Sequence, residues 1–113
     1  MTILTVCRAG LCRSVSLADI LKLHYESVDV LPVGIDFNSE TTKNMLYEWA
    51  DKIVVMEQHY LYKIPEIYHP KVIVCDVGPD VWFNPKHPDL ISKIWIWLKD
   101  KSGLDLVEHH KVL

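Results

Sequence analysis

Short apolar runs alternate with longer amphipathic segments along most of the chain. The first run, Ile3–Cys7, is short and rich in β-branched residues, as buried strands often are. Similar runs predict three more strands, at Asp29–Val33, Lys52–Met56 and Lys71–Cys75. Strands that alternate with helices favour a parallel sheet covered on both faces, so we predict a three-layer α/β/α fold with a four-stranded sheet.

The segments between these runs contain residues that begin and end helices. We expect Ser14 and Ser39 to cap the first two helices, because serine side chains accept hydrogen bonds from the first turn. Pro65 is expected to end the third helix, and Pro88 to occupy the first turn of the fourth. The predicted helices run from Ser14 to about Glu26, then over Glu40–Ala50, Glu57–Ile64 and His87–Lys101. The helical side chains expected to face the core are Leu17, Ile20, Leu21, His24, Met45, Leu46, Trp49, Leu90, Ile91, Ile94, Trp95, Trp97 and Leu98.

One motif lies where the first strand gives way to the first helix. Cys7 ends the strand, five residues follow, and Arg13 and Ser14 stand where the helix should begin. Five residues are enough to curl the backbone into a cup of N–H groups, and a cup that opens at a helix N-terminus binds anions. The motif also lies at the carboxyl end of a strand, where sheets of this kind bind their ligands.

The residue types in this motif suit phosphate chemistry. A cysteine at the base of such a cup is exposed to the loop amides and the helix dipole, which favour a nucleophilic thiolate. Arg13 offers a planar fork that matches two phosphate oxygens. The alternative is that Cys7 is a small buried hydrophobe beside an incidental Arg-Ser pair. The required strand before the motif and helix after it make that alternative the weaker one.

The run Val6-Cys7-Arg8-Ala9-Gly10-Leu11-Cys12-Arg13-Ser14 resembles the signature of the low-molecular-weight protein tyrosine phosphatases, in particular their short members. The resemblance extends from about Thr2 to Lys101, and Trp49–Glu57 is similar to the family's helix end, third strand and Met-acidic pair. It implies a phosphatase-I-like sheet of order 2-1-3-4. It also implies that Cys7 is the nucleophile, that Arg13 binds phosphate and that the Ser14 hydroxyl steadies the thiolate. The phosphate-binding loop would comprise Arg8, Ala9, Gly10, Leu11, Cys12 and Arg13.

The loop departs from the family pattern at one position. The family usually has Asn three residues after the nucleophile, where this chain has Gly10. Glycine tolerates the left-handed backbone needed there but supplies no side-chain hydrogen bond, so we expect a less rigidly braced loop. Cys12 matches a second loop cysteine found in many members. It is either a small packing residue or a partner that traps oxidised Cys7 as a disulfide, as in related phosphatases.

A general acid is expected just after the fourth strand. The family places an aspartate there, because the departing oxygen needs a proton. Asp76 matches by its position, and Asp80 is the alternative because the family's usual Asp-Pro pair is absent. Either aspartate could instead make only a loop hydrogen bond. Trp82 follows this segment and is a candidate wall of the substrate pocket, although a loop tryptophan often serves as an anchor to the core.

The composition is compatible with a phosphatase but does not make that interpretation more specific. The chain has 113 residues and a formal net charge of −3, so we expect one domain, residues 1–113, with no affinity for nucleic acid or membrane. Three cysteines and no signal-like start favour a reducing cytoplasm. No metal or other cofactor is expected, since His109 and His110 are adjacent rather than spaced as ligands. Phe37 and Trp82 mark the loops expected to determine specificity.

The expected activity is hydrolysis of phosphotyrosine in a protein, or of a small aryl phosphate, through a phosphocysteine. Three alternatives remain. The run Cys7–Leu11 also resembles the opening of cysteine-type IIB subunits of sugar phosphotransferase systems, which carry phosphate but lack an arginine at the position of Arg13. Arsenate reduction would need a relay of two more cysteines downstream, and only Cys75 remains. A phosphate-binding module with weak catalysis is the third alternative.

Overall fold

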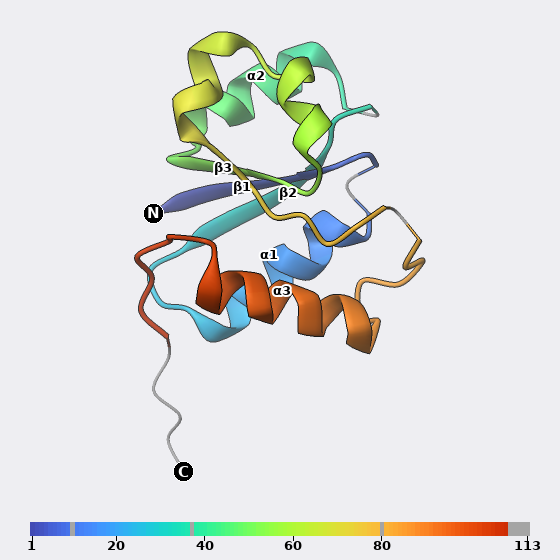
Figure 1. Ribbon diagram of the computed structural model, residues 1–113. Helices are drawn as coiled ribbons and strands as arrows, with labels where there is room; N and C mark the ends of the chain where they lie inside the picture. The colour runs from blue at the N-terminus through green and yellow to red at the C-terminus, as the bar shows by residue number, and fades with distance from the viewer. Residues whose placement is uncertain (10, 37, 80, 109–113) are drawn as a thin grey trace.

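Four strands form one parallel sheet at the centre of the molecule (Figure 1). The computed structural model of the chain describes residues 1–9, 11–36, 38–79 and 81–108, so Gly10, Phe37, Asp80, His109 and His110 lie outside the described residues. The sheet order is β2-β1-β3-β4, which confirms the predicted fold class. The strands are β1 (Thr2–Cys7), β2 (Asp29–Gly34), β3 (Lys52–Val55) and β4 (Val72–Val74).

Helical segments cover both faces of this sheet. Figure 1 shows α1 and α3 on one face, with α2 and two short 3₁₀ segments on the other. The central strand β1 alternates between the two layers: Ile3 and Cys7 pack toward α1 and α3, whereas Leu4 and Val6 pack toward α2. The helical segments are α1 (Arg13–His24), α2 (Glu40–Trp49), η1 (Gln58–Lys63), η2 (Glu66–Lys71) and α3 (Pro88–Asp100).

The start of α1 differs from the prediction. The helix begins at Arg13, and the residue before it, Cys12, makes no side-chain capping bond. Ser14 is therefore inside the first turn, and the prediction that it caps the helix is wrong. Its hydroxyl contacts Cys7 instead, because the first turn of α1 faces the end of β1. His24 is exposed at the last turn and meets Trp95 edge-on, so it does not belong to the buried side.

The buried face of α2 was also predicted incorrectly. Met45 and Trp49 are exposed, and the core contacts come from Leu46 and Tyr47. Tyr47 is almost fully buried, so α2 turns the face that carries this aromatic ring toward the core. Ser39 does cap α2, since its hydroxyl accepts a hydrogen bond from the N–H of Thr42.

The later segments follow the prediction with two changes. The segment expected as a helix over Glu57–Ile64 is 3₁₀ over Gln58–Lys63, and a second 3₁₀ segment, which we did not predict, precedes β4. α3 begins at Pro88 as predicted, and His87 caps it. The side chains that α3 buries are Leu90, Ile94, Trp97 and Leu98.

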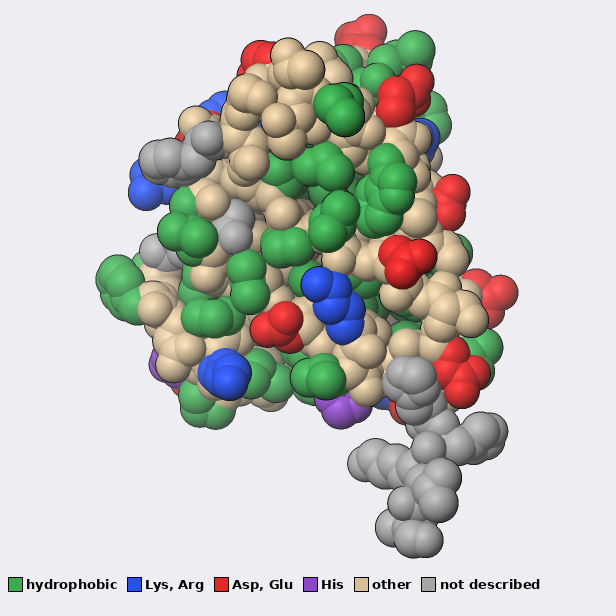
Figure 2. Space-filling model, turned by 180° about the vertical axis from the view of Figure 1, so that it is seen from behind, with side chains coloured by type: hydrophobic (Ala, Val, Ile, Leu, Met, Phe, Trp, Pro, Cys, Tyr) green, Lys and Arg blue, Asp and Glu red, His purple; other side chains and the backbone are tan. Residues whose placement is uncertain are grey.

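Several large hydrophobic side chains remain at the surface. The face opposite to that of Figure 1 has hydrophobic side chains gathered across its middle, with charged side chains among and around them (Figure 2). Among the described helices, none has the length and apolar character that crossing a membrane requires.

Candidate active site

The end of β1 is held from both sides, and this fixes the position of Cys7. The main chain of Cys7 pairs with Gly34 of β2, and its carbonyl accepts the N–H of Ile35 at 2.9 Å. On the other side, the carbonyl of Val6 accepts the N–H of Met56, just after β3, at 2.8 Å. Cys7 is buried at the carboxyl edge of the sheet, where the sequence placed the candidate nucleophile.

The structure brings Ser14 against this cysteine. The Sγ of Cys7 lies 3.0 Å from the Oγ of Ser14, within hydrogen-bond distance for sulfur, and both side chains are buried. The hydroxyl of Thr5 donates to the carbonyl of Ser14 at 2.8 Å, which ties the first turn of α1 to the middle of β1. A hydroxyl so placed can donate a hydrogen bond to a thiolate.

Arg13, the first residue of α1, is fully buried. Its Nη1 donates to the carbonyl of Gly78 at 3.0 Å. Its Nη2 donates to Oε2 of Glu57 at 3.2 Å and to the hydroxyl of Tyr60 at 2.9 Å. The guanidinium therefore joins the motif to the segment after β3 and to the segment after β4.

Charge and burial act in opposite directions in this cluster. Burial lowers the pKa of Arg13, but the neighbouring Tyr60 and Glu57 outweigh it, so the pKa lies above its ordinary value. Burial raises the pKa of Glu57, yet hydrogen bonds from Tyr60 and Arg13 hold that pKa below its ordinary value. Burial is also the main cause of the raised pKa of Tyr60. The ion pair between Arg13 and Glu57 therefore remains charged at neutral and mildly acidic pH.

Gly34 allows the loop after Cys7 to approach β2. A Cβ on this glycine would lie 2.4 Å from both the carbonyl carbon and the carbonyl oxygen of Ala9. Backbone atoms cannot yield as a flexible side chain does, so only glycine fits here. Asn38 completes the contact, since its Oδ1 accepts the N–H of Gly34 at 2.8 Å.

We expect Gly34→Ala to disrupt the loop that follows Cys7. The added methyl group must push Ala9 away, which we expect to lower the free energy of unfolding by about 1–3 kcal/mol. Turnover of an aryl phosphate should fall by about 10²-fold, because the loop donors move relative to Cys7. Gly103→Ala is the matched control: its φ of +64° makes alanine strained as well, but a Cβ there meets nothing within 4 Å. Equal turnover in the two variants would contradict this prediction.

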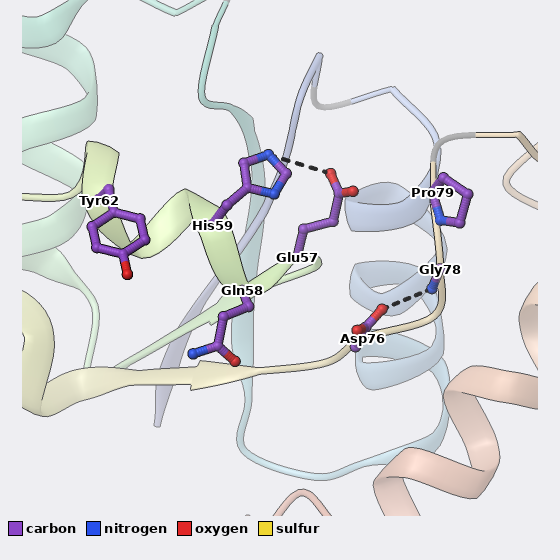
Figure 3. Close-up of a pocket in the computed structure, with 7 residues that line it drawn as sticks. All are labelled: Glu57, Gln58, His59, Tyr62, Asp76, Gly78 and Pro79. Carbon is purple, nitrogen blue, oxygen red and sulfur yellow. Dashed lines mark hydrogen bonds and ion pairs between the residues drawn. The ribbon is translucent and has the colours of Figure 1, made fainter.

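Asp76 lies at the surface just after β4. Its Oδ1 accepts the N–H of Gly78 at 2.9 Å, an Asx turn that orients the carboxylate. A cavity of about 460 Å³ opens beside it. Figure 3 shows Asp76 and Glu57 projecting from neighbouring segments at this cavity, with His59 toward Glu57. The lining residues are Glu57, Gln58, His59, Tyr62, Asp76, Gly78 and Pro79.

The other predicted site residues lie around the motif. Arg8 and Leu11 are exposed, whereas Ala9 and Cys12 are half-buried; Gly10, between them, is outside the described residues. Trp82 packs against the core and meets the ring of His87 edge-on at 5.2 Å, and its buried Nε1 makes no hydrogen bond to the part of the chain described. In the same described part, no group of three or more His, Cys, Asp or Glu residues is placed to hold a metal ion.

Sequence reasoning missed three residues of this site. Tyr60 and the backbone of Gly78 contact Arg13, and Gly34 permits the close approach of the loop. In the sequence, Glu57 stands out only as part of the segment Trp49–Glu57 that resembles the phosphatase family. A glycine at the end of a strand that neighbours the motif was a signal for close backbone approach. No local pattern marked Tyr60, because its partner lies 47 residues away in the sequence.

The fold is shared with a solved structure. No protein-family model matches the chain, and no curated protein matches it significantly. The structure of Vibrio vulnificus Wzb, determined in complex with benzylphosphonate, aligns with a TM-score of 0.51. The two sequences are 17% identical, and the alignment covers 87% of this chain and 97% of Wzb. This likeness is one of fold, and it agrees with the predicted α/β class.

Proposed function

We propose that this chain is a cysteine-dependent phosphatase that hydrolyses phosphotyrosine or small aryl phosphate monoesters. The observation that carries the proposal is the placement of Cys7 Sγ 3.0 Å from Ser14 Oγ, beside the buried Arg13 at the start of α1. In this proposal Cys7 is the nucleophile, the Ser14 hydroxyl stabilises its thiolate, and the Arg13 guanidinium binds the phosphate oxygens. The fold shared with Wzb supports a phosphatase. The benzylphosphonate bound to Wzb has an aromatic ring and a tetrahedral phosphonate, which resemble the ring and the phosphate of an aryl phosphate.

The first chemical step transfers the phosphoryl group to the sulfur of Cys7. The Cys7 thiolate attacks the phosphorus in line, so that the S–P bond forms as the bond to the leaving oxygen breaks. The amides of the loop, over Arg8–Cys12, and the Arg13 guanidinium hold the three equatorial oxygens. Asp76 donates its proton to the departing oxygen. The products are the free alcohol or phenol and a phosphocysteine.

The second step regenerates the cysteine. Asp76, now ionised, accepts a proton from water as that water attacks the phosphocysteine. The S–P bond breaks, and the hydroxyl of Ser14 donates a hydrogen bond to the departing thiolate. Inorganic phosphate then leaves the loop. Trp82 is proposed to border the aromatic part of the substrate.

The choice between Asp76 and Asp80 makes a separate prediction. Asp76→Asn should lower kcat/KM, which reports the first step alone, by about 10²-fold or more with phenyl phosphate, a substrate whose leaving group needs a proton. With p-nitrophenyl phosphate the loss should be smaller, because its leaving group departs without full protonation. Asp80→Asn is the matched control and should keep turnover on both substrates. Loss in Asp80→Asn alone would transfer the role to Asp80, and no loss in either variant would remove this proton transfer from the mechanism.

The function itself is tested by steady-state hydrolysis of p-nitrophenyl phosphate at mildly acidic pH, without added metal. We expect sustained release of phosphate and a phosphocysteine that is detected only after rapid acid quenching. A stable phosphocysteine without turnover would instead support the phosphate carrier. Phosphate binding with neither a covalent intermediate nor turnover would support a binding module.

A further inference from the structure

We propose that Glu57 and Tyr60 are positioning residues, which hold the Arg13 guanidinium in the orientation that receives an oxyanion. The inference deepens the proposed function and rests on it where turnover is concerned, but its central claim concerns anion binding alone. It assigns a role to two side chains that lie outside the motif. Neither is expected to touch the substrate phosphate.

Both acceptors act on the same nitrogen. Nη2 of Arg13 has two protons, and it donates to Glu57 Oε2 at 3.2 Å and to the Tyr60 hydroxyl at 2.9 Å. The guanidinium is planar, so two fixed acceptors on one terminal nitrogen determine the plane of the whole group. Arg13 and Tyr60 are almost completely buried, and Glu57 is about one quarter exposed, which leaves the group little room to rotate.

The backbone around η1 holds both acceptors, Glu57 and Tyr60, in place. Glu57 follows the end of β3, which is attached to β1 by the hydrogen bond from the N–H of Met56 to Val6. The N–H of Tyr60 then donates to the carbonyl of Glu57 at 3.2 Å and closes the first turn of η1. The two acceptors are thus held to the same strand pair that holds Cys7. A flexible arginine side chain would otherwise have to be ordered when the anion binds.

The same guanidinium also contacts the segment proposed to contain the acid. Nη1 of Arg13 donates to the carbonyl of Gly78, and the N–H of Gly78 donates to Asp76. Gly78 has a φ of +89°. In this conformation its carbonyl faces Arg13 and its N–H faces Asp76. A guanidinium displaced from Glu57 and Tyr60 would therefore shift this segment as well. We expect their loss to affect both anion affinity and kcat.

The experiment compares Glu57→Gln and Tyr60→Phe with the wild type. Affinity for inorganic phosphate is measured by calorimetry in a Cys7→Ser background, and kcat and KM for p-nitrophenyl phosphate with Cys7 intact. We expect Glu57→Gln to weaken phosphate binding by about tenfold and to lower kcat by about 10- to 100-fold. Tyr60→Phe should lower both by about three- to tenfold, since it removes a neutral hydroxyl that accepts from Arg13 and donates to Glu57 but leaves the charged partner of Arg13 in place.

Matched controls come from the same regions. Tyr47 is a buried tyrosine of the same core cluster, and its hydroxyl makes no hydrogen bond to the described residues. Glu66 is an exposed carboxylate in η2. Tyr47→Phe and Glu66→Gln should both remain within about twofold of the wild type in phosphate affinity and kcat.

The outcomes separate this inference from the proposed function. Phosphate affinity and kcat within about twofold of the wild type in folded Glu57→Gln and Tyr60→Phe would overturn the inference, even if thermal stability fell. Weaker phosphate binding in these variants would support it, whether or not the wild type hydrolyses the ester. Absent hydrolysis by the wild type, with phosphate binding that depends on Glu57, would reject the phosphatase but retain the positioning role.

Discussion

Cys7→Ser is expected to abolish hydrolysis of aryl phosphates, with a loss of at least about 10⁴-fold in kcat. Serine preserves the size of the side chain and its distance from Ser14, so the fold should persist. What changes is the nucleophile, because a hydroxyl is scarcely ionised at mildly acidic pH and no neighbouring base is proposed to activate it. Steady-state release of p-nitrophenol, beside thermal unfolding of both proteins, measures this effect.

Cys75→Ala provides the control for cysteine loss in general. Cys75 is fully buried just after β4, and burial raises the pKa of its thiol, so it is a packing residue. Its replacement should leave turnover within about twofold and lower the free energy of unfolding by about 1 kcal/mol. Residual activity above about 1% in Cys7→Ser would contradict the assignment of Cys7 as nucleophile.

Arg13→Lys is expected to have the second largest effect. Lysine keeps the positive charge, but the three N–H groups of its ammonium cannot donate to the carbonyl of Gly78, to Glu57 and to Tyr60 and still bind a phosphate, whereas the guanidinium has five. We expect kcat/KM to fall by about 10³-fold. Phosphate affinity should fall with it, as measured by calorimetry in the Cys7→Ser background.

Arg8→Lys gives the contrast, because Arg8 is the other arginine of the loop and its side chain is exposed. Only its main-chain N–H belongs to the proposed anion cup, so we expect a loss below about tenfold. A similar loss in the two variants would show that a positive charge near the loop is sufficient, and that the fork geometry of Arg13 has no special role.

The fold was predictable because it depends on local patterns. Short β-branched runs such as Ile3–Cys7 become strands in any context that buries them, and their alternation with helices determines a parallel sheet. The place of Cys7 at the carboxyl edge follows from the same pattern. Helix faces were less predictable, as α2 shows: several apolar residues competed for the core, and the packing of Tyr47 decided the outcome.

The sequence by itself determined the strands, the position of Cys7 at the edge of the sheet and the arginine and serine that follow at the helix start. The tertiary structure alone decided what these residues meet. Arg13 contacts Glu57, Tyr60 and Gly78, which lie 44, 47 and 65 residues further along the chain. Local periodicity places a side chain on a strand or helix, but such distant partners are set only when strands and helices pack. The same packing gave Gly34 its role, because the backbone of Ala9 passes close to it only in the folded sheet.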